Sequence, residues 1–279
     1  MTYQNLKQAF EFVGKTTWVT LENAYKLNLS FGETTISDSI LLYLMQSNNP
    51  KIKILQTKQN EESKKGTDWE WWIGSPSMGW LRYAVQAKKY NTRKCAYSSL
   101  NHDVKDSKTK TKSKQWQILE NYTVEKNAIP IYSLYNFVSL NEEFKNDNHL
   151  TEQRKQIEIL KLLDSNSKIN PFYGITITSL KNIKTALKTR GGRNFYFIHE
   201  FKDTIPLPKL VEITKDYISK NKFSKNPEIL FGVVPKIYEK FDFIQNNNKL
   251  NFISSNQSDV NFFGKRVLII DIGEENEPK

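Results

Sequence analysis

The segment from Gly66 to Tyr90, GTDWEWWIGSPSMGWLRYAVQAKKY, decides the fold. Two runs rich in aromatic and branched residues flank a short stretch of the turn formers Gly, Ser and Pro. In the second run, apolar residues alternate with arginine, glutamine and lysine. This pattern predicts a β-hairpin with strands at 67–74 and 80–90.

The hairpin carries polar side chains that alternation places together. Successive side chains of a strand point to opposite faces, so Asp68 and Glu70 share one face. On the returning strand Gln86 and Lys88 share a face, and Ala87 points away. Adjacent strands lie about 4.8 Å apart. Asp68, Gln86 and Lys88 would therefore converge on one ion if the hairpin places them on the same face.

Such a cluster suits the hydrolysis of a phosphodiester. That reaction needs a metal that polarises the phosphate, oxygen ligands, and a group that orients water. Mg²⁺ retains several waters, so two or three protein ligands are sufficient. The expected ligands are the Asp68 carboxylate, the Gln86 amide oxygen and the Ala87 main-chain carbonyl, while Lys88 would position the attacking water.

These residues resemble the Asp…(Glu/Gln)-x-Lys motif of the PD-(D/E)xK, restriction endonuclease-like, nuclease superfamily. The Gln-x-Lys version is similar to that of type IV restriction-like enzymes. More closely, a bacterial family of unknown function, met near phage-defence genes and thought to be nuclease-like, resembles this chain over about residues 30–138. The matching segments are FGETTISDSILLYL (31–44), GTDWEWWI (66–73), VQAKKY (85–90), a downstream glutamine-containing helix and PIYSLYN (130–136).

The resemblance implies a mixed β-sheet core flanked by helices, and a site that uses Mg²⁺ or Mn²⁺. It assigns catalysis to Asp68, Gln86 and Lys88. An acid on the first helix often helps to hold the metal in that superfamily, and Glu33 occupies that place. Gln86 stands where an acid is more usual, which lowers the negative charge of the site. Glu70 or Glu33 would compensate as a metal ligand.

Each of these residues also has a structural interpretation. Asp68 could cap a strand or a turn. Gln86 and Lys88 could form an exposed strand face, where lysine commonly guards against aggregation. Glu33 could be a first-turn acid that the helix dipole favours. Tryptophans are more often core residues than platforms for nucleic-acid bases. Trp72, on the face of Asp68, is the exception we expect near a substrate channel.

The charge of the chain points to a polyanionic partner. Forty-one Lys and Arg against thirty Asp and Glu leave a formal charge of +11 over 279 residues. Lys and Arg bind phosphates by displacing counterions, although a basic solvated surface is the plain alternative. Lys89, Arg93 and Lys94 follow the site lysine and are expected to contact the phosphate backbone. The lysine-rich loop 105–114 is a further candidate.

Other chemistries find little support. The chain has one cysteine, so no intramolecular disulfide or cysteine zinc site can form. Its three histidines lack ligand spacing. RGGR (190–193) lacks the strand, helix and GK[ST] context of a phosphate-binding loop and is interpreted as a turn. No run approaches 18 apolar residues, so we expect no membrane contact and a cytoplasmic location.

The remaining pattern alternates strands and helices, which indicates an α/β fold. Three parts are expected: a nuclease-like core at 1–140, a linker with a charged helix at 141–170, and an α/β portion of unknown role at 171–279, either separate or continuous with the core. Helices are predicted at 3–30, 33–46, 115–127, about 178–189 and 207–221; strands at 51–58, 128–137, about 173–177, 190–201 after a turn, and 265–273.

The sequence is compatible with three functions. The first is a magnesium-dependent endonuclease, favouring DNA over RNA, that acts in bacterial defence against phage. The second is a catalytically inactive module that keeps the nuclease fold and binds nucleic acid or serves as a scaffold. The third is a protein-interaction adaptor driven by the C-terminal third. A partner defence protein, an activating signal and pairing into a homodimer are compatible with the first.

Overall fold

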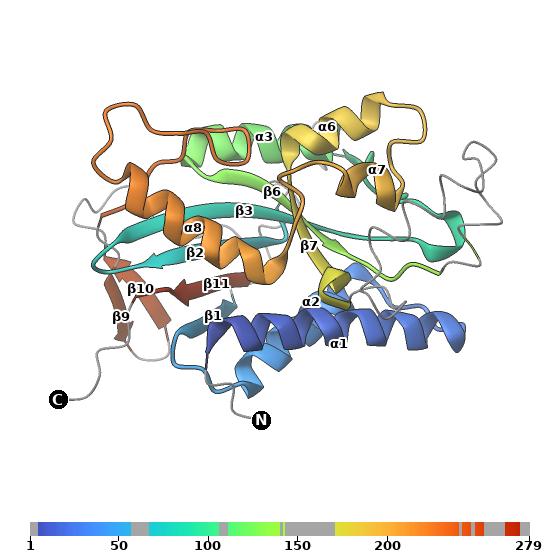
Figure 1. Ribbon diagram of the computed structural model, residues 1–279, viewed down its shortest axis with the longest axis horizontal. Coiled ribbons are helices and arrows are strands. Elements are labelled where there is room, and N and C mark those ends of the chain that lie inside the picture. Colours follow the sequence, from blue (N-terminus) through green and yellow to red (C-terminus); the bar gives the residue numbers. More distant parts are fainter. Residues whose placement is uncertain are drawn as a thin grey trace.

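A seven-stranded mixed sheet forms the centre of the described part of the chain (Figure 1). The computed structural model describes residues 5–56, 67–105, 111–139, 142, 171–239, 242–246, 249–253 and 266–273. The strands, in spatial order, are β1 (Ile52–Gln56), β11 (Arg266–Asp271), β2 (Trp69–Ser75), β3 (Gly79–Lys89), β6 (Ile129–Tyr135), β7 (Ile175–Ser179) and β8 (Ile205–Pro206). The predicted α/β class is confirmed.

The predicted hairpin is the pair β2 and β3. These strands run antiparallel, and Trp69 lies opposite Val85. Their tight turn depends on glycine, because Gly79 has a φ of +97° and a Cβ on Gly74 would lie 2.1 Å from the Gly79 carbonyl oxygen. β3 extends beyond the start of β2, so residues 86–89 of β3 have no partner in β2.

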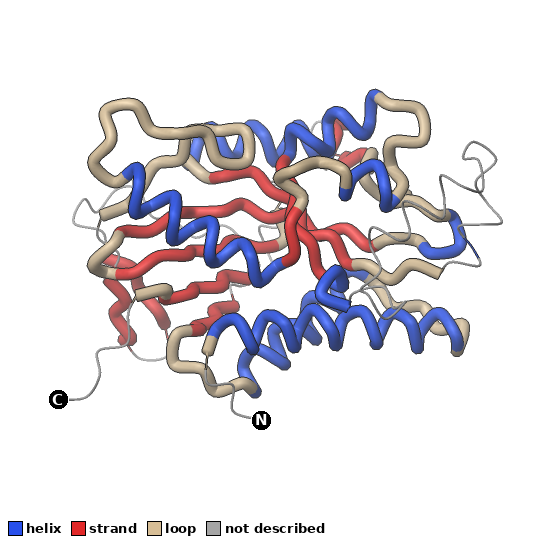
Figure 2. Tube along the Cα trace, viewed as in Figure 1, coloured by secondary structure: helices blue, strands red, loops and turns tan. Residues whose placement is uncertain are grey.

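The six helices of the described ranges cover the sheet in two layers (Figure 2). On one face, Tyr83 Oη lies 2.7 Å from Thr214 Oγ1 of α8, and α1 packs beside α8. On the other face, Arg82 donates to Tyr122 of α3. The helices are α1 (Leu6–Lys26), α2 (Glu33–Gln46), α3 (Gln115–Lys126), α6 (Leu180–Lys188), α7 (Phe195–His199) and α8 (Leu207–Asn221).

Helix α2 is fixed to the sheet through its polar side. Ser37 lies 2.8 Å from the Tyr135 hydroxyl and accepts the Trp69 indole N–H at 3.3 Å. Asp38 pairs with Arg266 of β11 at 2.5 Å. Because these contacts come from three different strands, they set the position of the first turn of α2, which begins at Glu33.

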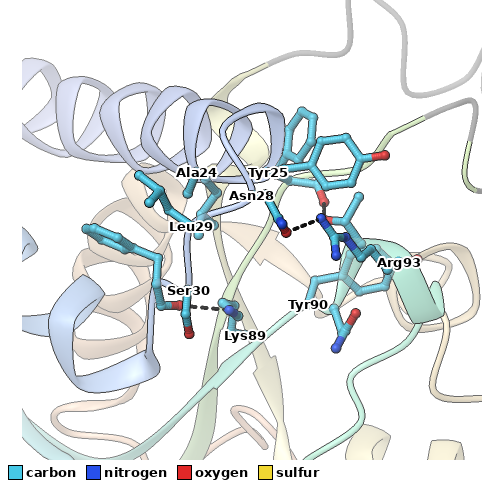
Figure 3. Close-up of a pocket in the computed structure, with 13 residues that line it drawn as sticks. Ala24, Tyr25, Asn28, Leu29, Ser30, Lys89, Tyr90 and Arg93 are labelled. Carbon is cyan, nitrogen blue, oxygen red and sulfur yellow. Dashed lines mark hydrogen bonds between the residues drawn. The ribbon is translucent and has the colours of Figure 1, made fainter.

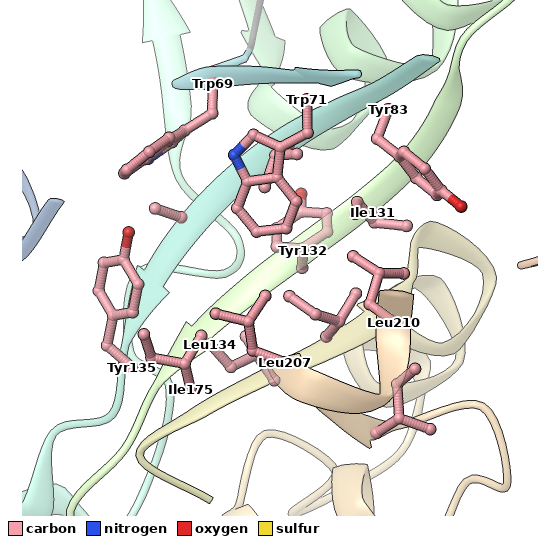
Figure 4. Close-up of a cluster of buried hydrophobic side chains, with 14 of the residues drawn as sticks. Trp69, Trp71, Tyr83, Ile131, Tyr132, Leu134, Tyr135, Ile175, Leu207 and Leu210 are labelled. Atoms are coloured by element: carbon pink, nitrogen blue, oxygen red, sulfur yellow. The ribbon is translucent and has the colours of Figure 1, made fainter. Parts of the chain in front are cut away.

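One part of the hydrophobic core lies between the sheet and α8 (Figure 4), and the core extends to α3 and α6. The tryptophans at 69, 71, 72 and 80 are at most 3% exposed, as expected for core residues. Leu207 and Leu210 of α8 lie near Ile131 of β6, and all three side chains are buried. At about 25 cal/mol per Å² of buried apolar area, this layer supplies much of the folding free energy.

Strands from both ends of the chain share the sheet. β11 lies between β1 and β2, parallel to β2 and antiparallel to β1 (Figure 1). β7 pairs antiparallel with β6 on the other side. Residues 171–273 thus contribute three strands to the sheet that also contains the hairpin. The predicted linker helix within 141–170 lies outside the described residues, apart from Glu142.

The expectation of a strand within residues 190–201 was wrong. Phe195–His199 forms the short helix α7, whose cap Asn194 accepts the Phe197 N–H at 2.7 Å. The apolar run FYFI was too short for its periodicity to distinguish strand from helix. Around the lysine-rich loop, β4 (Asp103–Lys105) and β5 (Lys112–Lys114) pair, and 106–110 lie outside the described residues.

Two further features complete the described fold. β9 (Asp242–Asn246) and β10 (Lys249–Ile253) form a separate antiparallel pair. RGGR lies in a turn after α6, as predicted, and Gly191 has a φ of +73°. None of the helices in the described ranges combines the length and the hydropathy needed to cross a membrane.

Candidate active site

Asp68 lies against the C-terminal part of β3, where Gln86, Ala87 and Lys88 are buried. Its main-chain N–H donates to the Val85 carbonyl at 2.9 Å, which continues the hairpin pairing. Its Oδ2 accepts the main-chain N–H of Ala87 at 2.8 Å and a hydrogen bond from Gln86 Nε2. The carboxylate therefore satisfies a strand N–H and lies directly beside the Gln-Ala-Lys segment that the sequence singled out.

Lys88 and Glu33 form the second half of the cluster. Lys88 Nζ lies 3.5 Å from Glu33 Oε2, and the lysine side chain is only 5% exposed. The other carboxylate oxygen of Glu33 accepts the Lys89 N–H at 3.0 Å and the Ser99 hydroxyl at 2.8 Å. Glu33 is held from two sides, so it can orient the Lys88 ammonium.

The charged groups of Lys88, Glu33 and Arg266 lie close enough to Asp68 to affect its pKa. Burial raises the pKa of the Asp68 carboxyl above its ordinary 3.8, because the charged form loses its hydration. The nearby Lys88 charge and the Ala87 N–H oppose that rise, while Glu33 adds to it. Arg266, from the far end of the chain, also opposes it. The Asp68 proton is thus sensitive to three charged neighbours.

Two buried polar atoms at this site lack a hydrogen-bond partner among the described residues: Gln86 Oε1 and the Tyr132 hydroxyl. Tyr132 lies in register with Gln86 on the neighbouring strand β6. Burial raises the pKa of Tyr132, and the nearby Asp68 charge raises it further. Unpaired buried polar groups are costly in a folded protein, so these two atoms call for an explanation, and a ligand bound at this site would supply one.

Glu70 and Trp72 lie in a separate network. Glu70 is fully buried and accepts Arg82 at 2.9 Å, the Trp72 indole N–H at 2.7 Å and the Tyr122 hydroxyl at 3.2 Å. Trp72 is fully buried and packs edge-on against Tyr238, with ring centres 5.1 Å apart. The structure therefore does not bring Glu70 to the metal ligands, and it gives Trp72 no open face for stacking.

Of the three expected phosphate contacts, Lys89 lies beside the cluster, where its main-chain N–H donates to Glu33. Lys89 is half-buried, its Nζ donates to the Phe31 carbonyl at 2.7 Å, and burial lowers its pKa. Arg93 and Lys94 are exposed in a 3₁₀ turn that follows β3. Arg93 donates to Asn28 Oδ1 at 2.6 Å.

The donors present fit a hard divalent cation of the Mg²⁺ type. Asp68, Glu33, the Gln86 amide oxygen and the Ala87 carbonyl supply oxygen, and the Gln86 oxygen is an acceptor without a donor. The Ala87 carbonyl is close enough to accept Gln86 Nε2 at 3.3 Å. Within the described ranges, no three His, Cys, Asp or Glu residues cluster as metal ligands. The four candidate ligands are therefore the two carboxylates and the two neutral oxygens named above.

Three residues of this site were not predicted from the sequence: Tyr132, Ser99 and Arg266. Tyr132 had a usable signal, because the strand 128–137 alternates and its pairing with the hairpin follows from the fold. Ser99 lies in a loop and Arg266 begins a distant strand. Neither carries a local pattern that ties it to Asp68, so only the tertiary structure reveals them.

Residues 6–251 match a family described as "Family of unknown function (DUF6615)", and the chain belongs to this family. The match covers the hairpin, Glu33 and Tyr132, together with α8. No curated protein matches the chain.

Proposed function

We propose that this member of the DUF6615 family is a metal-dependent endonuclease that hydrolyses phosphodiester bonds of nucleic acid, DNA in preference to RNA. The observation that carries the proposal is the convergence of the Asp68 carboxylate, the Gln86 amide and the charge of Lys88 at the end of β3. A role in bacterial anti-phage defence, in the cytoplasm, rests on the sequence resemblance alone. The preference for DNA has the same basis.

Asp68, Gln86, the Ala87 carbonyl and Glu33 would hold Mg²⁺ or Mn²⁺. When bound, such an ion supplies a Lewis acid that polarises the phosphate and acidifies water. Asp68 must be ionised to serve as a ligand, and the neighbouring Lys88 charge favours that form. Gln86 Oε1, which has no hydrogen-bond donor among the described residues, would gain the metal ion as its partner.

Lys88 is the residue to which we assign the stabilisation of charge during the reaction. Its ammonium is almost entirely withdrawn from water and is oriented by Glu33. A fixed positive charge in a site of low dielectric stabilises negative charge on a phosphoryl group far more than a solvated lysine does. Lys88 thereby positions the attacking water and offsets the charge that develops on the non-bridging oxygens.

A second function is favoured by one specific contact. Gln86 Nε2 already donates to Asp68, so the carboxylate has a neutral partner without any metal. A protein that has lost catalysis but kept the nuclease fold would need such a substitute. The alternative is therefore an inactive module that binds nucleic acid or acts as a scaffold.

The two functions are separated by an assay of cleavage. We would incubate the full chain with supercoiled plasmid, single-stranded DNA and RNA, each with Mg²⁺, with Mn²⁺ and with chelator. Lys88→Ala is the test variant. Lys188→Ala, on the exposed side of α6, is the control with the same loss of charge.

The nuclease proposal predicts cleavage by the wild type and by Lys188→Ala with a divalent metal, and at least about a 100-fold loss in Lys88→Ala, as is usual when a charge-stabilising group is removed. Cleavage that survives in Lys88→Ala contradicts the assigned chemistry. Binding of nucleic acid without cleavage under every metal condition supports the inactive module instead.

A further inference from the structure

A cavity lies on the outer side of Lys89, next to the candidate active site (Figure 3). Its volume is about 310 Å³. One wall is the end of α1 with the segment that follows it, and the other is the end of β3 with the 3₁₀ turn. The residues that line it are Leu21, Ala24, Tyr25, Asn28, Leu29, Ser30, Phe31, Lys89, Tyr90, Asn91, Thr92, Arg93 and Phe137.

The cavity shares structural elements with the site. The main-chain N–H of Lys89 donates to Glu33, while its Nζ donates to Phe31, which lines the cavity. Lys88 precedes it and faces the same Glu33 carboxylate. A molecule in the cavity would therefore lie beside the groups that we assign to the metal and to the scissile phosphate.

The lining has a specific chemical character. Lys89 and Arg93 supply positive charge, and no aspartate or glutamate is among the described residues that line the cavity. Tyr25 supplies an aromatic ring, whose hydroxyl donates to Glu142 at 2.9 Å. The Arg93 guanidinium lies 5.9 Å from the centre of that ring. Cations bind phosphate, and rings with an arginine plane stack nucleic-acid bases.

Polar groups that read base edges are also present. Asn28 and Asn91 each carry an amide whose Nδ2 can donate to the edge of a base, while their Oδ1 atoms accept Arg93 and the Lys94 N–H. The volume lies at the lower end of the range for small-molecule pockets, about 300–1,000 Å³. It suits one nucleotide, whereas the stacked and paired bases of a duplex cannot enter.

We propose that this cavity binds one unpaired nucleotide, through its phosphate at Lys89 and Arg93 and its base against Tyr25. In a single strand, this nucleotide would flank the scissile phosphate, which deepens the function proposed above and rests on it. A free nucleotide offers the same chemistry and would act as an activating signal. In both cases the occupant is a nucleotide with an exposed base.

Binding is measured in chelator, so that no cleavage occurs and the result is independent of catalysis. We would follow fluorescence anisotropy of a labelled single-stranded oligonucleotide and of the same sequence as a duplex. Isothermal titration calorimetry with unlabelled mononucleotides forms a separate arm. The variants are Arg93→Ala and Tyr25→Leu, with Lys188→Ala as the control for one lost positive charge.

The proposal predicts that Arg93→Ala and Tyr25→Leu each weaken binding about 10-fold, which is the usual scale for loss of one stacked base. Lys188→Ala changes it far less. Loss of oligonucleotide binding in the variants assigns the cavity to the substrate strand; loss of mononucleotide binding alone assigns it to a free nucleotide. Equal effects of Arg93→Ala and Lys188→Ala, or binding of neither probe by the wild type, would overturn the proposal, whatever the outcome of the cleavage assay.

Discussion

The Asp68 carboxylate accepts the main-chain N–H of Ala87 at 2.8 Å, between the side chains of Gln86 and Lys88 along β3. This contact fixes an acid at a partly buried position where the charged form is poorly hydrated. Burial consequently raises the pKa of Asp68, although Lys88 opposes the rise. A group in this state releases its proton most readily when a cation arrives, because the cation replaces the lost hydration.

Metal affinity should therefore depend on pH. A carboxylate binds a metal only when ionised, so Mn²⁺ affinity is expected to rise as pH increases from 3.8 through the raised pKa of Asp68. In the metal-free protein, a rise in pH through the pKa of Asp68 lowers the free energy of unfolding. The contribution of Asp68 to the free energy of unfolding is fully present below pH 3.8 and is lost as pH rises through the folded pKa.

The measurement is Mn²⁺ titration and thermal unfolding over this pH range, for the wild type and Asp68→Asn. The difference between the two proteins isolates Asp68 from the other acids. At neutral pH, the metal-free Asp68→Asn protein should be at least as stable as the wild type, since it buries no charge. A Mn²⁺ affinity that is independent of pH across this range would contradict the assignment.

The unpaired hydroxyl of Tyr132 gives a second prediction. A buried donor without a partner costs about 1–3 kcal/mol, so Tyr132→Phe should raise the free energy of unfolding by about 1 kcal/mol. Tyr83→Phe is the matched control, because the Tyr83 hydroxyl has a partner at 2.7 Å in Thr214. That variant should lose about 1 kcal/mol. Urea unfolding checks both; a loss of stability in Tyr132→Phe would be inconsistent with an unpaired hydroxyl.

The hairpin and most helices were predictable because their signals are local. The alternation of 80–90 and the turn formers before it define β3 and the turn. The same pattern placed Gln86 and Lys88 together, and α8 follows its apolar periodicity. Face alternation also grouped Glu70 with Asp68, but it could not show that Glu70 forms an ion pair with Arg82.

The rest of the fold depends on contacts between distant segments. Nothing in the run RVLIID indicates that β11 enters the sheet between β1 and β2, because its pairing partners lie about two hundred residues away. Arg266 reaches Asp38 and influences Asp68 only as a result of that pairing. The helix α7 was missed because a short apolar run does not distinguish a helix from a strand by its periodicity.

The Glu70–Arg82 pair supplies a third prediction, on stability rather than on chemistry. Both side chains are at most 1% exposed, and removing one partner from a buried pair costs about 3–5 kcal/mol. Glu70→Leu should be destabilised by this amount, and Glu70→Leu with Arg82→Met should recover most of it. Urea unfolding measures the stability. A folded, stable Glu70→Leu protein that has lost Mn²⁺ binding would instead make Glu70 a ligand.

The position of β11 makes a fourth prediction. Truncation at about residue 140 removes β7, β8 and β11, which leaves β1 without its partner and exposes one edge of β2 and of β6. The shortened chain should not fold, and circular dichroism with size-exclusion chromatography should show an unfolded or aggregated product. A soluble, cooperatively unfolding fragment would show that residues 1–140 are stable alone, and its cleavage activity would then decide whether the C-terminal third acts as an adaptor.

The most direct test of the account is calorimetric titration of Mn²⁺ into the wild type, Asp68→Asn and Gln86→Glu at neutral pH. Oxygen ligands with more negative charge bind a divalent cation more tightly. We predict that Gln86→Glu binds Mn²⁺ more tightly than the wild type and that Asp68→Asn shows no binding. Equal Mn²⁺ affinity in Asp68→Asn and the wild type would contradict the claim that these residues form a metal site.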